Sequence, residues 1–110
     1  MISDISKMFQ FIFFMGIVGS DSYLEGGVLI DVRYKDEWDN DHIEGAILIP
    51  NPEIEEKIAS VVPDKETPIN IHCASGMRAS NAKSKLLKMG YKHVANIGGL
   101  SAAKRKHQGH

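Results

Sequence analysis

The residues of this chain that could carry out chemistry lie in one short stretch, which reads I-N-I-H-C-A-S-G-M-R over residues 69–78. A β-branched apolar run ends there on Cys73, the only cysteine, and a helical pattern begins at Arg78. Backbone N–H groups converge where a strand leads into a helix, and the helix dipole adds positive charge, so this position favours an anion. The nearest available anion is the thiolate of Cys73, which is the reactive form of a cysteine. The stretch therefore predicts a reactive site.

The loop that is predicted to surround the sulfur supplies backbone donors and one charge. Its residues are Ala74, Ser75, Gly76, Met77 and Arg78. We expect each of them to turn a backbone N–H toward the sulfur, with Gly76 at the positive φ that a tight curl requires. The Arg78 guanidinium can fork onto sulfonate or phosphate oxygens, and the Ser75 hydroxyl is a further donor. A strand cysteine is also compatible with an inert core residue, so the flanking segments must decide.

The composition of the whole chain excludes several classes of function. With 110 residues and a formal net charge of −1, the chain has the size of one domain and no electrostatic basis for binding nucleic acid. A single cysteine excludes an internal disulfide and a CxxC redox pair, so a thiol that resolves Cys73 must come from another molecule. The five histidines lack the spacing of a metal site, and we predict no metal and no cofactor. Nothing in the sequence requires more than a monomer.

The N-terminal segment has features of a signal peptide. Met8–Gly19 is an apolar run that is long enough for a signal core and too short to span a membrane, and Lys7 precedes it. We therefore expect residues 1–20 to be an export signal that is cleaved near Ser20. The alternative is an apolar N-terminal segment that packs on the core of a cytoplasmic protein.

From Asp21 onward, strand patterns alternate with helix patterns. Short apolar runs predict strands over Val28–Val32, Ala46–Ile49, Ile69–Cys73 and His93–Ile97. Helical spacing predicts helices over Tyr34–Asn40, from Asn51 to Val62, over Arg78–Met89 and over Leu100–Lys104. Such alternation favours an α/β domain with a mostly parallel sheet that helices cover on both faces. Ligands of such sheets bind beyond the carboxyl ends of the strands, which is where the loop after Cys73 lies.

Local chemistry predicts the ends of some elements. Asn51 is expected to cap its helix because proline and glutamate follow it, and Trp38 is expected to contact the core. Residues 105–110 are expected to form a frayed basic tail in which His107 is solvated.

Several polar residues are expected to have structural roles. Asp31 and Arg33 are predicted to form an ion pair that braces the end of the sheet near the loop. His42 is expected to bond to the backbone near the following turn. His72 precedes Cys73, so in a regular strand its side chain points to the opposite face, which argues against a Cys–His catalytic pair.

Five segments then occur in an order that resembles the rhodanese family. They are L-I-D-V-R (29–33), E-W (37–38), D-H-I-E-G-A (41–46), the cysteine loop, and M-G-Y-K-H-V-A-N-I-G-G-L (89–100). The chain resembles a single-domain rhodanese, or thiosulfate sulfurtransferase, from about Gly27 to Leu100. Among these it is most similar to the small periplasmic phage-shock protein E type.

The resemblance implies a three-layer α/β domain over residues 21–104, whose sheet is central and mostly parallel. It also implies that Cys73 takes sulfur from thiosulfate or another sulfane-sulfur donor, carries it as a persulfide and passes it to cyanide or a thiol. Ala74 stands where an arginine often follows the cysteine, and the loss of that charge weakens thiosulfate binding. The resemblance further implies a periplasmic location.

Two other functions stay open. Cysteine-dependent phosphatases and arsenate reductases place five residues between cysteine and arginine, whereas four residues separate Cys73 from Arg78. The shorter loop suits one bound sulfur better than a tetrahedral oxyanion, and the loop holds no acid that could protonate a leaving group. The other alternative is a non-catalytic module that carries sulfur or binds a partner protein.

Overall fold

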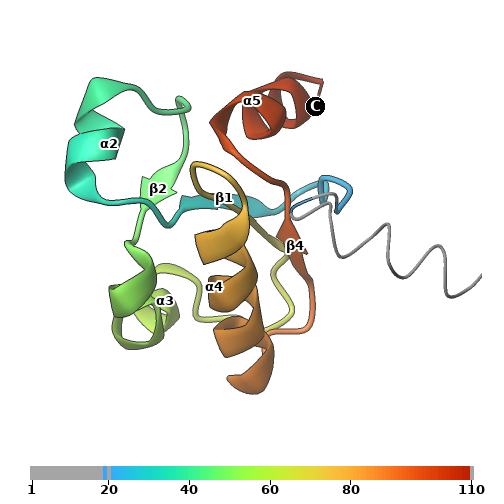
Figure 1. Ribbon diagram of the computed structural model, residues 1–110. Coiled ribbons are helices and arrows are strands. Elements are labelled where there is room, and N and C mark those ends of the chain that lie inside the picture. Colours follow the sequence, from blue (N-terminus) through green and yellow to red (C-terminus); the bar gives the residue numbers. More distant parts are fainter. Residues whose placement is uncertain (1–18, 20, 110) are drawn as a thin grey trace, which may run out of the picture.

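Four short strands form the centre of the computed structural model, which describes residue 19 and residues 21–109 (Figure 1). They are β1 (Val28–Asp31), β2 (Ile47–Leu48), β3 (Ile69–His72) and β4 (Val94–Asn96). The strands are all parallel and lie in the order β2-β1-β3-β4. The carboxyl ends of parallel strands lie at one edge of the sheet, and the loop after β3 leaves from that edge.

Helices connect the strands and cover both faces of the sheet. They are α2 (Lys35–Asn40), the 3₁₀ turn η1 (Asn51–Glu53), α3 (Ile54–Val61), α4 (Met77–Lys88) and α5 (Leu100–Gln108). Figure 1 shows α3 and α4 together on one side of the sheet and α5 on the other. The prediction of a three-layer α/β fold with a parallel sheet is therefore confirmed.

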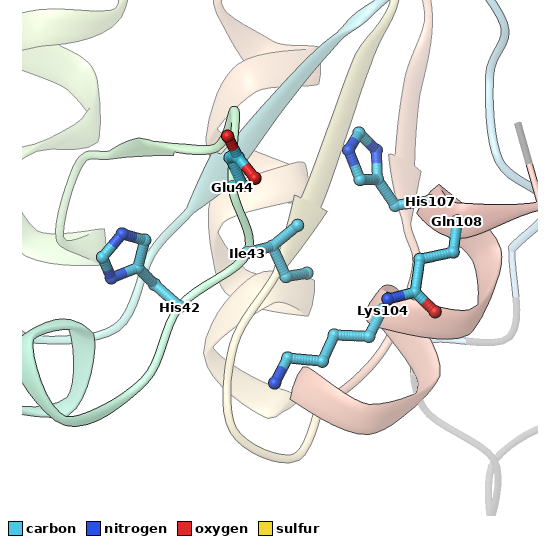
Figure 2. Close-up of a pocket in the computed structure, with 6 residues that line it drawn as sticks. All are labelled: His42, Ile43, Glu44, Lys104, His107 and Gln108. Atoms are coloured by element: carbon cyan, nitrogen blue, oxygen red, sulfur yellow. The ribbon is translucent and has the colours of Figure 1, made fainter.

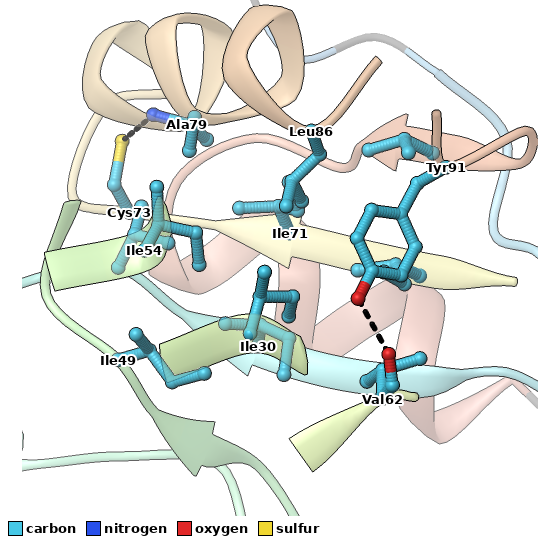
Figure 3. Packing of buried hydrophobic residues seen from close by; sticks show 14 residues of the cluster. Ile30, Ile49, Ile54, Val62, Ile71, Cys73, Ala79, Leu86 and Tyr91 are labelled. Carbon is cyan, nitrogen blue, oxygen red and sulfur yellow. Dashed lines mark hydrogen bonds between the residues drawn. The ribbon is translucent and has the colours of Figure 1, made fainter. Parts of the chain in front are cut away.

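The face under α3 and α4 carries the larger apolar core (Figure 3). Ile30 and Ile71 project from the central strands toward Ile54 and Leu86 of the two helices, and all four side chains are buried. The hydroxyl of Tyr91 donates a hydrogen bond of 2.5 Å to the carbonyl of Val62, which satisfies the polar end of an otherwise apolar side chain. Cys73 belongs to the same core, at the end nearest the start of α4.

The face under α5 combines a smaller apolar cluster with buried polar groups. Leu29, Ile97 and Ala103 form the centre of the cluster. Asp31 and His72 are neighbours in the register of β1 and β3, so they share a face, and both are buried. Alternation along a strand explains why one face of the sheet is apolar and the other carries buried polar groups, because successive side chains point to opposite faces.

The predicted frayed tail is wrong for the residues that the structure describes. Helix α5 continues to Gln108, well past the predicted end at Lys104. Nδ1 of His107 lies 2.9 Å from the Tyr23 hydroxyl, and Nζ of Lys106 donates to the carbonyl of Asp21 at 2.9 Å. These contacts with a segment distant in sequence stabilise the last turns of α5, so His107 is half-buried rather than solvated.

Two local predictions are also wrong. Trp38 lies outside both apolar cores and instead stacks on the ring of His42, with centroids 3.8 Å apart and an interplanar angle of 3°. Helix α2 buries none of its residues, so its tryptophan has no core to reach. Asn51 was predicted to cap its helix, but it is the first residue of the turn η1, and Pro50 precedes that turn. The Asn51 amide instead donates to the side chain of Asn81 on α4 at 2.9 Å.

The predicted export signal lies outside the described residues, apart from Gly19. Within the part of the chain that the structure describes, no helix has the length and apolar character to cross a membrane.

Candidate active site

Cys73 is the first residue after β3, and neighbouring elements hold it from two sides. Its backbone N–H donates to the carbonyl of Gly98 at 3.1 Å, which ties the end of β3 to the segment after β4. Its side chain is 0% exposed and points toward the first turn of α4, as Figure 3 shows for Cys73 and Ala79. The sulfur therefore lies at the carboxyl edge of the sheet, under the start of a helix.

Two backbone N–H groups donate to the sulfur of Cys73. The N–H of Gly76 lies 2.9 Å from Sγ and that of Ala79 lies 3.4 Å from it. Gly76 has φ +95°, so the predicted positive φ is confirmed at the position where the loop turns into α4. Among the loop donors predicted from the sequence, Gly76 alone bonds to Sγ. The second donor comes from the first helical turn, where N–H groups have no partner within the helix.

The loop is braced from the segment after β4. Nδ2 of Asn96 donates to the carbonyl of Gly76 at 2.9 Å, and Ser75 pairs with Gly99 in an antiparallel bridge. A Cβ added to Gly99 would lie 2.3 Å from the carbonyl oxygen of Ala74, so only glycine fits there. Sequence reasoning missed Asn96 and Gly99 as site residues. The sequence signal that could have found them is the polar Asn96 in an apolar strand, with a glycine pair at residues 98–99 soon after it.

The Arg78 guanidinium forks onto Glu37 of α2. Nη1 and Nη2 lie 2.7 and 2.8 Å from the two carboxylate oxygens, so the fork predicted for a substrate anion is occupied by a side chain. The hydrogen bonds from Arg78 lower the pKa of Glu37 from 4.5 to about 2, with a further contribution from the N–H of Tyr34. Glu37 was not predicted as a site residue, because its partner lies 41 positions away in the sequence.

The predicted ion pair of Asp31 and Arg33 is present on the α5 face. Nε and Nη2 of Arg33 donate to the carboxylate of Asp31 at 2.8–3.0 Å, and both side chains are buried. His72 shares this face, with Nε2 3.6 Å from the Asp31 carboxylate and without a hydrogen-bond partner. Burial lowers the pKa of His72. The ring is therefore on the face opposite the sulfur of Cys73, and no Cys–His pair forms.

A separate hollow of about 430 Å³ lies between α5 and the segment after α2 (Figure 2). Its lining residues are His42, Ile43, Glu44, Lys104, His107 and Gln108. Lys104 forms an ion pair with Asp41 at 2.6 Å. Nδ1 of His42 lies 2.8 Å from the carbonyl of Trp38 in the preceding helix, so its backbone contact is not at the following turn, where it was predicted. Across the described ranges, no three His, Cys, Asp or Glu side chains gather as metal ligands. The loop after Cys73 remains the candidate active site.

Comparison with known proteins gives the family. The family model for the rhodanese-like domain matches residues 20–106 of this chain. The chain belongs to the rhodanese family. It is 45% identical over 71 residues to the thiosulfate sulfurtransferase PspE of Escherichia coli K12, covering 64% of this chain and 68% of that protein. It is 31% identical over 81 residues to the thiosulfate sulfurtransferase GlpE of Coxiella burnetii, covering 73% of this chain and 74% of that one.

A solved structure supports the same assignment. The fold matches that of a rhodanese with anions from E. coli with a TM-score of 0.67 and 42% sequence identity, over 69% of this chain and 89% of that one. The resemblance predicted from the five ordered segments is therefore confirmed at the level of family and fold.

Proposed function

We propose that this rhodanese is a sulfurtransferase in which Cys73 carries the transferred sulfur as a persulfide. The observation that carries the proposal is the convergence of the Gly76 and Ala79 N–H groups on the cysteine sulfur. Such donors stabilise negative charge on sulfur without a side-chain base. The naming of PspE and GlpE as thiosulfate sulfurtransferases supports the same reaction class.

The proposed reaction has two steps at one sulfur atom. The Cys73 thiolate attacks the outer sulfur of thiosulfate, a new S–S bond forms, and the original S–S bond breaks with its electron pair on the departing sulfite. Cyanide or a thiolate then attacks the outer sulfur of the persulfide, and the Cys73 thiolate leaves. Ala74, Ser75, Gly76, Met77 and Arg78 form the proposed binding loop. Asp31 and Arg33 support the sheet beneath it.

Intact-mass measurement after incubation with thiosulfate tests the proposal. We expect a gain of one sulfur atom, loss of that atom on addition of cyanide, and no gain in Cys73→Ser. A matched control is the double variant Cys73→Ser with Ser84→Cys, which places a thiol on the exposed side of α4 and is expected to stay unloaded.

Other outcomes of the same experiment would contradict the proposal. No gain of sulfur together with hydrolysis of an aryl phosphate favours a cysteine-dependent phosphatase. A persulfide that forms but never turns over with cyanide or small thiols favours a sulfur carrier.

Export to the periplasm is a further part of the proposal. Cleavage after residue 20 would keep the contacts of Asp21, whose carboxylate accepts from Lys83 at 2.7 Å and from the Asn96 N–H at 2.8 Å. N-terminal sequencing of the native protein tests it, since a start near Asp21 supports cleavage and an intact Met1 contradicts it.

A further inference from the structure

One buried amide joins two residues that each bond to Cys73. Asn96 of β4 is 4% exposed, and both ends of its side chain are hydrogen-bonded. Nδ2 donates to the carbonyl of Gly76 at 2.9 Å, and Oδ1 accepts the N–H of Gly98 at 3.1 Å. Gly76 in turn donates its N–H to the Cys73 sulfur at 2.9 Å, and the Gly98 carbonyl accepts the Cys73 N–H at 3.1 Å. The Asn96 side chain therefore links the loop to the segment that holds the backbone of Cys73.

The position of Asn96 in the sheet explains how its side chain reaches the loop. Asn96 is the partner of Ile71 in the register of β3 and β4, so the two side chains lie on the same face. Ile71 and Cys73 both belong to the apolar core under α3 and α4. A polar side chain on such a face costs free energy unless its hydrogen bonds are made. The two bonds of the amide satisfy that requirement, and one of them goes to the loop around the sulfur.

Gly76 is a part of the loop that needs an external contact to fix it. It has φ +95° and no side chain, so its own conformational preference does not set the direction of its N–H. Its carbonyl accepts the N–H of Ser80 at 3.0 Å from within α4, and the amide of Asn96 from the sheet. The first bond fixes Gly76 to the helix, and the second fixes it to the sheet that carries Cys73. The Asn96 bond therefore sets the position of Gly76 relative to the sulfur.

Charged groups fix the backbone of Asn96, whereas its side chain is neutral. The Asn96 N–H donates to the carboxylate of Asp21 at 2.8 Å, and Nζ of Lys83 lies 2.7 Å from the same carboxylate. Within the loop, the guanidinium of Arg78 is paired with Glu37. A neutral substitution at Asn96 can therefore remove the amide and leave each of these charges in place.

We propose that Asn96 is a positioning residue for Cys73, whose amide holds the Gly76 N–H on the sulfur and so favours the thiolate. A hydrogen bond to an ionised atom is stronger than one to a neutral atom, so a fixed donor stabilises the thiolate more than the thiol. Asn96 acts through Gly76 in this role. Its importance for catalysis rests on the proposed function, in which the thiolate attacks the sulfur donor.

Titration of the thiolate tests the proposal. Cys73 is the only cysteine, so the ultraviolet absorbance of the thiolate, after subtraction of that of Cys73→Ser, reports this sulfur alone. Asn96→Leu removes the amide at nearly the same volume and adds no charge. We expect it to raise the midpoint of the thiolate titration by about 0.5–1 pH unit, which is part of the strength of one hydrogen bond to a charged atom. Asn96→Ala is expected to shift the midpoint in the same direction, and it replaces Asn96→Leu if that variant does not fold.

Asn70→Leu is the matched control. Asn70 is also a buried asparagine of the sheet, and its amide bonds to the N–H and the carbonyl of Leu24 at 2.7 and 3.0 Å. It is the partner of Leu29 in the register of β1 and β3, so it lies on the α5 face, opposite the Cys73 sulfur. We expect Asn70→Leu to lower the melting temperature about as much as Asn96→Leu does and to leave the midpoint of the thiolate titration unchanged.

The outcomes distinguish the proposal from the function beneath it. A midpoint that both Asn96 variants leave unchanged, or one that Asn70→Leu shifts equally, overturns the proposal and leaves Asn96 with a structural role alone. In the thiosulfate experiment, Asn96→Leu is expected to load sulfur about three- to tenfold more slowly near neutral pH, where less thiolate is present. If the unaltered chain adds no sulfur, the proposed function fails, whereas the titration still decides whether Asn96 favours the thiolate.

Discussion

The two faces of the sheet are both buried, yet they are built from different chemistry. Under α3 and α4, Ile30 and Ile71 pack in an apolar core. Under α5, the next residues along the same strands are Asp31 and His72, which are equally buried. Apolar packing tolerates many side chains of similar volume, whereas a buried charge requires one partner in one geometry. Cys73 belongs to the apolar face, and its sulfur accepts hydrogen bonds from the backbone N–H groups of Gly76 and Ala79.

The largest expected effect comes from breaking the ion pair on the polar face. Asp31→Ala leaves Arg33 buried without its carboxylate, which is expected to lower the free energy of unfolding by about 4 kcal/mol. Urea denaturation measures the change. Asp39→Ala is the control, because it removes an exposed pair with Lys35 and is expected to change stability little.

A double variant sharpens the same comparison. Asp31→Leu with Arg33→Met replaces the pair by apolar side chains and is expected to recover most of the loss. If the double variant is as unstable as Asp31→Ala, the ion pair itself stabilises the polar face, and the loss in Asp31→Ala is more than the cost of leaving one charge unpaired.

On the apolar face, the cavity that a shortened side chain leaves sets the size of the loss in stability. Ile71→Ala is expected to lower the free energy of unfolding by about 3 kcal/mol, because Ile71 is fully buried beneath α4. The matched change Ile47→Ala, at a partly exposed position on β2, is expected to cost less than half as much. Equal losses in the two variants would contradict a core concentrated under α3 and α4.

The side chains of Glu37 and Arg78 are 29% and 32% exposed, so a smaller effect is expected than for the buried pair. Arg78 lowers the pKa of Glu37 from 4.5 to about 2, so the unfolded chain takes up the proton first as the pH falls. The stabilisation is complete above pH 4.5 and is lost between pH 4.5 and about 2. After allowance for solvent screening it amounts to about 1 kcal/mol. Glu37→Gln is expected to remove this part of the acid slope in denaturation series. A slope identical to that of the unaltered chain would contradict the pairing.

The smallest effect is expected at His72. Burial holds the pKa of its imidazole below 6.5, so the unfolded chain binds the proton first and stability falls as the pH drops through 6.5. His72→Leu is expected to remove that dependence and to change stability at pH 8 by less than about 1 kcal/mol, since Nε2 has no partner and Nδ1 loses only a long contact of 3.4 Å with the Cys73 carbonyl. A loss of several kcal/mol would show that the ring makes a contact such as a bridging water.

The features that sequence reasoning predicted correctly are local ones. Alternation along β1 and β3 and the apolar spacing of α4 depend on neighbouring residues, so the pattern predicts them directly. Gly76 was predicted at positive φ because a strand that turns sharply into a helix needs such a residue. The ion pair of Asp31 and Arg33 could also be predicted from the sequence, since the two residues lie on one face of the same extended segment.

The features that were missed join residues distant in the chain. Glu37 and Arg78 are 41 positions apart, and Tyr23 and His107 are 84 apart. The sequence offers each of these side chains many possible partners of suitable charge or polarity, and only the packed fold selects one of them. Trp38 failed for a related reason: its size favours a core position, but the short helix that carries it lies away from both cores.

The Cys73 sulfur has a second role at the start of α4. Gly76 precedes α4 and offers no side chain to cap it, so the sulfur accepts the Ala79 N–H that a capping serine or aspartate would otherwise take. The atom proposed to react is thus also the cap of the helix that follows it. Any change in the charge or length of that group is thermodynamically linked to the start of α4. The melting temperature of the protein should therefore report whether its cysteine is loaded or empty.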